Sequence, residues 1–299
     1  MSFNLITILG PTATGKTKLA AQLACEFNGE IISADSRQVY KGMDIGTGKD
    51  LTDYNINGKK IPFHLIDIIS PREEFNLFLF KKYFNEAFTE VSKRNKLPFL
   101  AGGTGLYLSS VLQSYKLRKS ITDNDRIMEL NLKDIDGLRE ILHKLNPYLH
   151  NTTDLLEKER IIKAILVSEA SRFVDEAEIN SLNIGIMPER NEIKRRISDR
   201  LKYRLEHGMI DEVESLIKDG ITFDKLNFFG LEYKFIGLYL KGELNYNDMF
   251  QKLNSAIHQF AKRQSTWFRK MEREGVMINW IDSGDYEQAK EIISKSFGF

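Results

Sequence analysis

Short apolar runs alternate with longer amphipathic segments along most of this chain. Each run has the length of a buried strand, and the runs cover residues 5–9, 30–34, 61–68, 98–101, 183–187 and 277–281. Helical periodicity lies between them at residues 16–27, 77–93 and 106–113. This alternation predicts an α/β fold, a doubly wound parallel sheet with helices on both of its faces.

The middle of the chain departs from this alternation. Residues 114–182 contain no strand-like run and show helical patterns at 135–145 and 155–171, separated by Asn146-Pro147. We therefore expect a helical insertion at 114–182, between a first part of the core at 1–113 and a second part at 183–299. The insertion has 11 basic and 13 acidic residues, so its charge does not mark it as a basic module.

The last third of the chain contains two long helical patterns. The first covers residues 189–218, with an apolar residue at every fourth position from 193 to 205. Arg196, Arg200 and Arg204 repeat at the same spacing on a neighbouring face, and a row of charges usually predicts a solvated face. The second pattern covers residues 246–274 and is rich in basic side chains.

The composition mainly excludes certain classes of protein. The 299 residues are 42% hydrophobic with a net charge of +1, so any nucleic-acid surface has to be local. The single cysteine, Cys25, cannot form an internal disulfide, and no apolar run has the length of a membrane span. We expect a cytoplasmic monomer with no membrane partner.

A glycine-rich loop follows the first apolar run and precedes the first helix. Residues 10–17 read GPTATGKT, the spacing of a phosphate-binding loop in the required strand-loop-helix context. Backbone N–H groups and the helix N-terminus would bind phosphate, Lys16 would add charge, and Thr17 would offer a hydroxyl to Mg²⁺. The predicted loop residues are Gly10, Thr12, Ala13, Thr14, Gly15, Lys16 and Thr17. This motif predicts a bound polyphosphate but does not say which one.

Two further segments follow predicted strands. Asp35 comes directly after the second run, and GGTGLY at 102–107 follows another run and opens a helix. Ligands of open α/β sheets bind at the carboxyl ends of strands, so we expect Asp35 in the same crevice as the glycine loop. Asp35 either caps the turn that follows it, or acts as a carboxylate that holds magnesium or accepts a proton.

The segment AKRQSTWFR at 261–269 interleaves basic and aromatic residues. Such a pattern can bind phosphates and stack on bases, or can belong to an ordinary amphipathic helix with its aromatic residues in the core. We expect Trp267 to lie in the core, whereas Lys262 and Arg263 are candidates for function.

These segments, in this order, closely resemble the tRNA dimethylallyltransferase (tRNA isopentenyltransferase) family. The matches are GPTATGKT at 10–17, DSRQVYKGMDIGTGK at 35–49, FHLIDI at 63–68, GGTGLY at 102–107, GMIDEVESL at 208–216 and AKRQSTWFR at 261–269. The resemblance implies transfer of a dimethylallyl group from dimethylallyl diphosphate to the exocyclic amine of the adenosine 3′ to the anticodon. It puts the diphosphate in the glycine loop and implies a tRNA anticodon stem-loop as partner, with Mg²⁺ as cofactor.

The resemblance also implies residue roles. Asp35 matches the catalytic aspartate that accepts the proton of the amine, and Thr104 matches a threonine that hydrogen-bonds at the reacting centre. The insertion would contact the anticodon loop. The implied tRNA-binding residues are Asp35, Ser36, Arg37, Gln38, Arg126, Glu159, Arg160, Ile161, Ile162, Lys163, Lys262, Arg263 and Gln264.

The chain departs from the family pattern before Gly230. The family carries an arginine there that helps to bind pyrophosphate, whereas this chain has Asn227; Lys234 and Arg263 are candidates to replace it. The insertion is also short and lacks an acidic residue after its 163–166 run. Three alternatives remain open at this point. They are prenyl transfer to free adenine nucleotides, a small-molecule kinase or nucleotide switch, and an inactive paralogue that only binds RNA.

Overall fold

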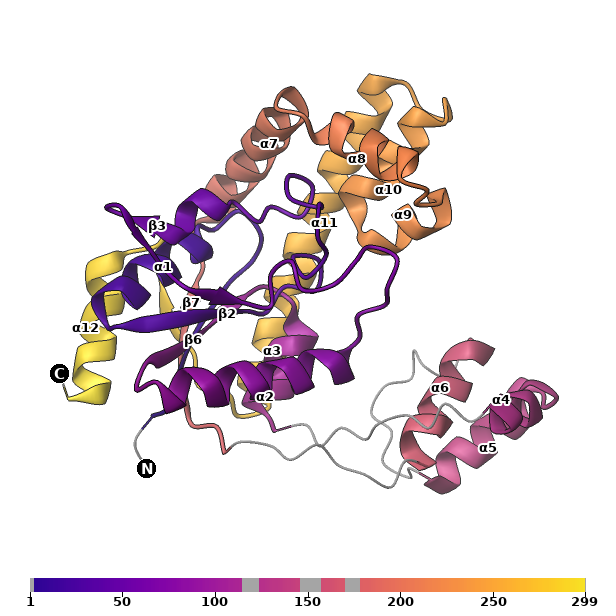
Figure 1. Cartoon of the computed structure of the whole chain (residues 1–299), viewed down its shortest axis with the longest axis horizontal. Helices are drawn as coiled ribbons and strands as arrows, with labels where there is room; N and C mark the ends of the chain where they lie inside the picture. Colours follow the sequence, from indigo (N-terminus) through magenta and orange to yellow (C-terminus); the bar gives the residue numbers. More distant parts are fainter. Residues whose placement is uncertain (1–2, 115–123, 146–156, 170–177, 299) are drawn as a thin grey trace. The chain divides into compact units, whose positions relative to one another are not determined.

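The structure is a computed structural model that describes residues 3–114, 124–145, 157–169 and 178–298 (Figure 1). The chain forms two compact units. The larger consists of Met1–Ser114 with Ala177–Phe299, and the smaller is Tyr115–Glu176. None of the helices in these described ranges is both long enough and apolar enough to cross a bilayer.

The larger unit is built on a six-stranded parallel sheet, which confirms the predicted fold class (Figure 1). Its strand order is β5-β2-β6-β1-β7-β8. The strands are β1 (Leu5–Leu9), β2 (Gly29–Ser33), β5 (Phe63–His64), β6 (Leu97–Gly102), β7 (Ser181–Ile186) and β8 (Asn279–Ile281). In the centre of the sheet, Ile6 pairs with Phe99 on one side and with Leu182 on the other. The short 3₁₀ turn η1 (Leu51–Tyr54) and the antiparallel pair β3 (Asn55–Ile56) and β4 (Lys59–Lys60) lie between β2 and β5 in the chain.

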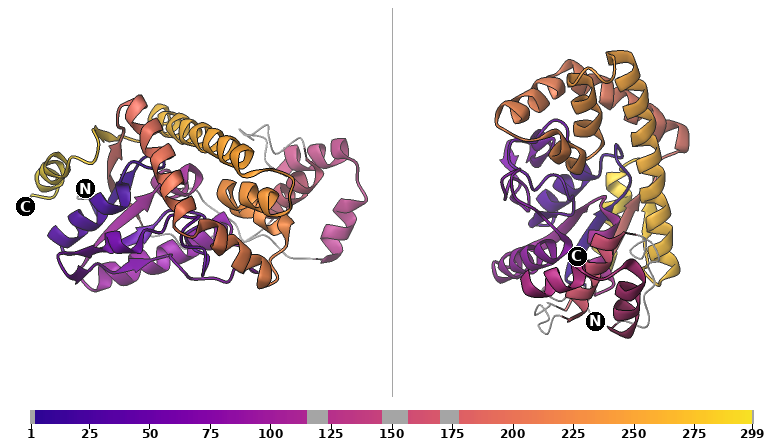
Figure 2. Two further views of the ribbon diagram at one scale, coloured as in Figure 1. Left: turned by 90° about the horizontal axis from the view of Figure 1, so that it is seen from above. Right: turned by 90° about the vertical axis from the view of Figure 1, so that its right-hand side faces the viewer.

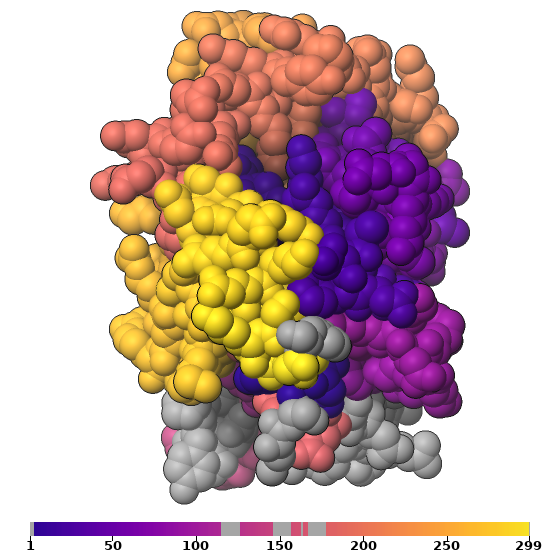
Figure 3. Space-filling view, turned by 90° about the vertical axis from the view of Figure 1, so that its left-hand side faces the viewer, coloured from indigo at the N-terminus to yellow at the C-terminus, as the bar shows by residue number. Residues whose placement is uncertain are grey.

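Helices cover both faces of the sheet. Ile6 and Ile8 of β1 face a core formed with α1 (Lys16–Glu26) and α12 (Tyr286–Phe297). Leu5 and Leu9 face the opposite core, formed with α2 (Leu77–Lys93), α3 (Gly105–Leu112) and α11 (Tyr246–Arg273). This two-residue alternation is what a strand buried on both faces requires. In Figure 3 the yellow C-terminal helix α12 lies directly against the indigo N-terminal segments.

Five helices lie between β7 and β8 in the chain. They are α7 (Arg190–Glu206), α8 (Met209–Lys218), α9 (Phe223–Phe229), α10 (Leu231–Leu240) and α11. Figure 2 shows α7 beside the long α11, and the two helices pack together. The single helix predicted at 189–218 is wrong, because the chain breaks at Gly208. This residue has a φ of 93°, a left-handed conformation that favours glycine and ends α7 before α8 begins.

The strand predicted at 61–68 is also wrong over most of its length. Only Phe63–His64 pairs with β2. Leu65 and Asp67 both have positive φ, so the chain turns instead of continuing the strand. Leu65 and Ile66 are buried in opposite cores, which explains why this turn reads as a continuous apolar run.

The smaller unit is helical in the ranges that the structure describes. It contains α4 (Asn124–Asn131), α5 (Ile135–Leu145) and α6 (Lys158–Glu169). The predicted helix at 135–145 is confirmed, and α6 lies within the predicted range 155–171. A separate core joins the three helices through Leu130, Leu138, Leu142 and residues of α6. The predicted break at Asn146-Pro147 lies outside the described residues.

Candidate active site

The glycine loop leaves β1 at Leu9 and leads into α1. A Cβ on Gly10 would lie 2.8 Å from the backbone oxygen of Ile186, so only glycine fits against β7. Gly15 has a φ of 80° and sits at the N-cap of α1. The Thr14 hydroxyl donates to the Pro11 carbonyl at 2.9 Å within the loop. These contacts within the chain help to fix the conformation of the loop.

A polar cavity lies at this loop, and we call it the loop cavity. The glycine-loop residues Thr12, Ala13, Thr14, Gly15, Lys16 and Thr17 line it together with Asp35, Gln38, Thr47, Gly48, Asp50, Asp53, Tyr54, Ala101, Gly102 and Arg200. The structure thus brings Lys16 and Asp35 to one cavity at the carboxyl ends of the strands, where the sequence predicted them to meet.

Asp35 is fixed by its own turn. Its Oδ1 accepts from the Arg37 backbone N–H at 2.9 Å, which is the turn-capping arrangement expected for an Asp at this place. No described residue donates a hydrogen bond to its Oδ2. Asp35 can therefore cap the turn and also accept a proton or bind magnesium, because the cap uses only Oδ1 and Oδ2 remains available.

Thr104 joins the segment after β6 to the segment after β2 through two hydrogen bonds. Its Oγ1 accepts from the Ser36 backbone N–H at 3.1 Å, and its own N–H donates to the Ala34 carbonyl at 3.2 Å. The segment after β2, which carries Asp35, is therefore bonded directly to the start of α3. A Cβ on Gly102 would lie 2.4 Å from the Ala34 oxygen, so this approach also requires glycine.

Two cationic side chains, Lys16 and Arg200, line the loop cavity. Burial lowers the pKa of Lys16 to about 8, and repulsion from Arg200 adds to this effect. Burial, with repulsion from Arg204, lowers the pKa of Arg200 to about 10. Both groups are charged at neutral pH, in surroundings that disfavour their charge. Such an arrangement is typical of an anion-binding site, because a bound anion would stabilise both positive charges.

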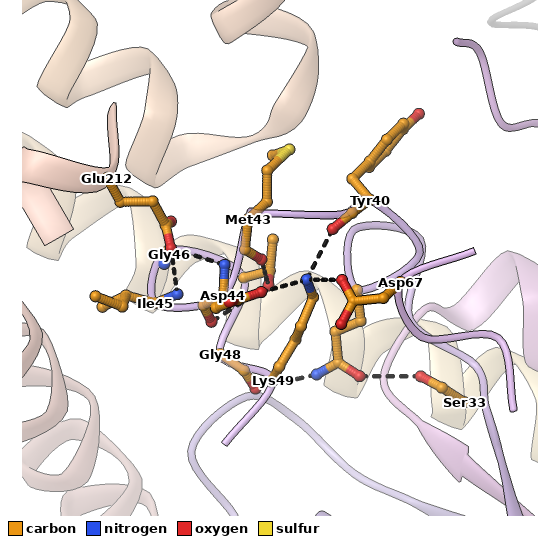
Figure 4. A network of polar contacts seen from close by, with 12 residues as sticks. Ser33, Tyr40, Met43, Asp44, Ile45, Gly46, Gly48, Lys49, Asp67 and Glu212 are labelled. Carbon is orange, nitrogen blue, oxygen red and sulfur yellow. Dashed lines mark hydrogen bonds and ion pairs between the residues drawn. The ribbon is translucent and has the colours of Figure 1, made fainter. Parts of the chain in front are cut away.

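The segment after Asp35 forms a rigid loop beside the cavity (Figure 4). Lys49 is 1% exposed, and its ammonium donates to the Tyr40 carbonyl at 2.7 Å and to the carboxylates of Asp44 and Asp67. This buried cation joins two parts of the loop to Asp67, which lies in the turn after β5. Gly48, which lines the cavity, is next to it in the chain.

Glu212 of α8 fixes the same loop from the outside. Its carboxylate accepts from the backbone N–H groups of Asp44 and Ile45, both at 2.7 Å, and of Gly46 at 3.0 Å (Figure 4). It also accepts from the Tyr233 hydroxyl at 2.7 Å. The resemblance matched this part of α8 without suggesting what it does, and the structure shows that it supports the cavity-lining loop.

The two glutamines that the resemblance links to tRNA, Gln38 and Gln264, form hydrogen bonds within the protein. The Gln38 side chain accepts from the Ser33 hydroxyl and donates to the Gly48 carbonyl, both at 3.0 Å. Gln264 accepts from the Thr12 N–H at 2.9 Å and donates to the Gly103 carbonyl at 2.8 Å, so it joins the two glycine loops. Each of the two residues is 7% exposed.

The other candidates of the larger unit lie nearer the surface. The Arg37 guanidinium lies 4.9 Å from the centre of the Phe228 ring, and Lys262 and Arg263 are exposed on α11. Trp267 donates to the Ser109 hydroxyl at 2.8 Å and packs against Gly105, in agreement with its predicted place in the core.

The candidates of the insertion divide into two groups. Glu159 and Arg160 are exposed on α6, whereas Ile161 and Ile162 form part of the insertion core. Arg126 pairs with Glu129 on α4. The side chain of Lys163 lies outside the described residues.

Two arginines at the cavity were not predicted. The row at 196, 200 and 204 was expected on a solvated face, yet Arg200 lines the loop cavity and Arg204 is only 7% exposed. Arg204 pairs with Asp50 at 3.1 Å, and its guanidinium occupies the space where Gly48 would carry a Cβ. The solvated-face prediction is wrong for these two residues, because this face of α7 is turned toward the loop cavity and its neighbours.

Comparison with known protein families gives two matches. A model described as IPP transferase matches residues 38–271, and a model described as Isopentenyl transferase matches residues 3–60. Similar proteins include tRNA dimethylallyltransferase 1 of Geotalea uraniireducens, 53% identical over 97% of this chain and 96% of that protein. The corresponding protein of Syntrophus aciditrophicus is 48% identical over 97% of each chain.

Solved structures show the same similarity. The full-length tRNA isopentenylpyrophosphate transferase from Bacillus halodurans superposes with a TM-score of 0.72 and 33% identity, over 99% of this chain and 97% of that one. A eukaryotic dimethylallyltransferase acting on tRNA has a TM-score of 0.74 at 23% identity, over 98% of this chain and 77% of its own. The second likeness concerns the fold alone.

Proposed function

Because the chain belongs to the IPP transferase family, we propose that it transfers a dimethylallyl group from dimethylallyl diphosphate to the exocyclic amine of the adenosine 3′ to the anticodon in tRNA. Pyrophosphate is released. The observation that carries this proposal is the loop cavity, where an anion-binding glycine loop and the carboxylate of Asp35 face the same space.

The diphosphate of the donor occupies the glycine loop. Backbone N–H groups, the N-terminus of α1 and the ammonium of Lys16 all favour negative charge there. As the bond between the allylic carbon and oxygen breaks, negative charge grows on the leaving diphosphate. These groups stabilise the charge as it develops, and they need no reorganisation because the loop is already fixed.

Asp35 acts on the other partner. The amine nitrogen of adenine forms the new bond to the allylic carbon while the electron pair of the old bond leaves with pyrophosphate. The nitrogen then carries an excess proton, which passes to the free Oδ2 of Asp35. Thr104 positions the Asp35 segment through its bond to the Ser36 N–H. The adenine has to leave its stack to reach this place, at a cost of a few kcal/mol.

Magnesium fits the residues of the cavity only as an ion held mainly by the substrate. The described residues contain no group of three or more Asp, Glu, His or Cys side chains that could hold a metal ion. Thr17, Asp50 and Asp53 do line the loop cavity, and Mg²⁺ commonly takes one or two protein ligands together with phosphate oxygens and water. A bound magnesium ion would neutralise charge on the leaving diphosphate.

We propose that the exposed Lys262 and Arg263 of the larger unit contact the tRNA. The tRNA contacts of the insertion are proposed separately, at its exposed Glu159 and Arg160. We also propose that the enzyme acts as a monomer. A tRNA substrate also supports a cytoplasmic location.

The variant Asp35→Asn tests the proposal. The amide oxygen can still accept from the Arg37 N–H, so the turn remains capped, but the side chain can no longer take a proton. We expect prenyl transfer to fall by about 10²–10⁴-fold with pyrophosphate binding retained. Normal turnover by Asp35→Asn would remove the assigned base.

The choice of acceptor is tested separately. An anticodon stem-loop and free AMP are offered side by side with labelled donor, and the products are identified by mass spectrometry. Transfer to AMP alone would favour the nucleotide alternative. ATP-dependent phosphoryl transfer without prenyl transfer would favour a kinase.

A further inference from the structure

A second cavity lies between α7 and α11, the two helices that Figure 2 shows side by side, and we call it the α7–α11 groove. Its volume is about 740 Å³, within the roughly 300–1,000 Å³ that small-molecule sites occupy. Its floor is apolar and consists of Met187, Pro188, Ile193, Ile197 and Ala261. None of the described residues that line this groove also lines the loop cavity, so the two are separate sites.

The α7–α11 groove lies at the carboxyl end of the sheet. Met187 directly follows β7, and Asp282 directly follows β8. In the strand order, β7 and β8 lie on one side of β1 and its glycine loop, while β2 and β6, which lead to Asp35 and Thr104, lie on the other. Ligands of open parallel sheets bind outside the carboxyl ends of strands. The groove therefore has the position of a ligand site that the proposed transfer reaction does not use.

Basic side chains surround the apolar floor. They are Arg190 and Lys194 of α7 and Lys262 and Arg269 of α11, and all four residues are exposed. None of these cations forms an ion pair within the ranges that the structure describes. Glu189 and Asp282 also line the groove, so its formal net charge is +2. Burial, with repulsion from Lys194, lowers the pKa of His258, which is therefore largely uncharged at neutral pH.

The groove offers three kinds of contact, and a nucleotide has one group for each of them. Its base can lie on the apolar floor, its phosphate suits the unpaired cations, and its ribose hydroxyls can donate to the carboxylates. An isoprenoid phosphate has no hydroxyl to donate to Glu189 or Asp282. A continuous RNA strand would bring further phosphates to the rim, where these two carboxylates would repel them. The chemistry of the groove therefore favours a single, free nucleotide.

We propose that the α7–α11 groove binds a free nucleotide, at a site separate from the loop cavity and additional to the proposed function. Lys194 and Arg269 bind the phosphate from the two helices, the arginine with its planar fork and the lysine as a point charge. Asp282 accepts hydrogen bonds from the ribose, as an acidic residue at the end of a neighbouring strand does in dinucleotide-binding folds.

Isothermal titration with AMP, GMP, CMP and UMP in turn tests the site, with the loop cavity filled by saturating inorganic pyrophosphate and magnesium. We expect at least one of the four to bind the wild-type protein, and Lys194→Glu and Arg269→Glu each to weaken its binding by about tenfold or more. Lys202→Glu is the matched control. Lys202 is exposed on α7 about two turns beyond Lys194, forms no ion pair among the described residues and does not line the groove. Lys262 is left unchanged because it is also proposed to contact tRNA.

Two further ligands separate the phosphate contact from the ribose contact. The nucleoside without its phosphate should bind weakly, and Lys194→Glu should not change its affinity. The 2′-deoxy form of the nucleotide should bind about tenfold more weakly than the ribonucleotide in the wild-type protein, and Asp282→Asn should reduce this preference. Because all of the substituted residues are exposed, the thermal midpoints of the variants should equal that of the wild type.

The outcomes also distinguish this inference from the proposed function. Binding of none of the four nucleotides would overturn the inference, and so would equal affinity in the wild type and Lys194→Glu, which would place the nucleotide elsewhere. A raised KM for tRNA in Lys194→Glu, without nucleotide binding by the wild type, would assign the groove to RNA instead. A protein that prenylates tRNA but binds no nucleotide loses only this inference. A protein that binds a nucleotide in the groove without prenylating tRNA loses only the proposed function.

Discussion

The affinity for the diphosphate donor should fall steeply between pH 7 and pH 9, because Lys16 loses its proton in this range. Burial is the main cause that lowers the pKa of the ammonium from 10.5 to about 8, and repulsion from Arg200 is the next largest cause, while Asp35 and Asp50 act in the opposite direction. The donor needs the charged form of Lys16. Its affinity therefore follows the fraction of protein in which this lysine is protonated.

The size of the effect follows from the pKa. With a value of about 8, roughly 90% of Lys16 is charged at pH 7 and roughly 9% at pH 9. The dissociation constant should therefore rise about tenfold between these two pH values. A lysine at its ordinary pKa of 10.5 would still be about 97% charged at pH 9, and the affinity would hardly change.

Titration with dimethylallyl diphosphate in the absence of tRNA measures this dependence directly. The donor itself completes its ionisation near neutral pH, so the change above pH 7.5 belongs to the protein. Lys16→Met should bind weakly with little pH dependence, whereas Lys18→Met, on the exposed side of the same helix, should keep the wild-type slope. A flat profile in the wild-type protein would refute the reasoning, and so would a wild-type slope in Lys16→Met.

Arg200→Gln provides an internal check on the cause. It removes the largest electrostatic repulsion on Lys16, so the pKa of the lysine should rise and the fall in affinity should move to higher pH. Overall binding should be weaker in this variant. If the pH midpoint of the fall in donor affinity did not change, the charge of Arg200 would not affect the pKa of Lys16.

Three substitutions probe how the site is supported. Gln264→Ala removes the bridge between the Thr12 N–H and the Gly103 carbonyl, so turnover should fall while tRNA affinity stays the same; a loss of tRNA affinity alone would instead support the predicted RNA contact. Glu212→Ala removes the acceptor of three loop N–H groups and should lower the free energy of unfolding by about 2 kcal/mol in urea, with a smaller loss in Glu212→Gln. Gly208→Ala forces a side chain into a left-handed backbone and should cost about 1–2 kcal/mol, whereas an unchanged urea midpoint would show that the helix break is not strained.

The parts of the fold that follow from local rules were predictable from the sequence. Five of the six strands and the helices α1, α2 and α3 follow from periodicity, and the glycine loop follows from a motif with a physical reason for each residue. The meeting of Asp35 with Lys16 follows from the rule that ligands bind at the carboxyl ends of parallel strands.

The errors arose where backbone conformation decided the outcome. Residues 65–68 are as apolar as a strand, but Leu65 and Asp67 adopt positive φ, which a hydrophobicity pattern does not reveal. The break between α7 and α8 did have a signal in the sequence. His207-Gly208 is followed by Asp211 and Glu212, a glycine C-cap and then acidic residues in a first helical turn, and the continuous apolar stripe of the helix outweighed it.

The roles of the two glutamines could not be read from their motifs. Gln38 and Gln264 lie in segments that the family resemblance links to tRNA, and an amide suits base recognition as well as it suits a buried bridge. Only the three-dimensional arrangement shows that both ends of each side chain are bonded within the protein.

The arginine row of α7 shows the limit of helical periodicity most clearly. Residues spaced by four in a helix of 3.6 residues per turn drift by about 40° at each step, so a row of three sweeps across about 80° of the surface. The side chain of Arg196 at one end is 32% exposed, the side chain of Arg204 at the other end is 8% exposed, and Arg200 between them reaches the glycine loop. The spacing predicts that the three share a neighbourhood on the helix, but it contains no information on what the helix packs against. A solvated row and a row that enters an anion site have the same sequence pattern, so the contacts of each arginine have to come from the structure. In this chain Glu192 pairs with Arg196 and Asp50 pairs with Arg204, while Arg200 has no carboxylate partner among the described residues. Arg200, which has no carboxylate partner among these residues, is therefore the arginine that faces the glycine loop.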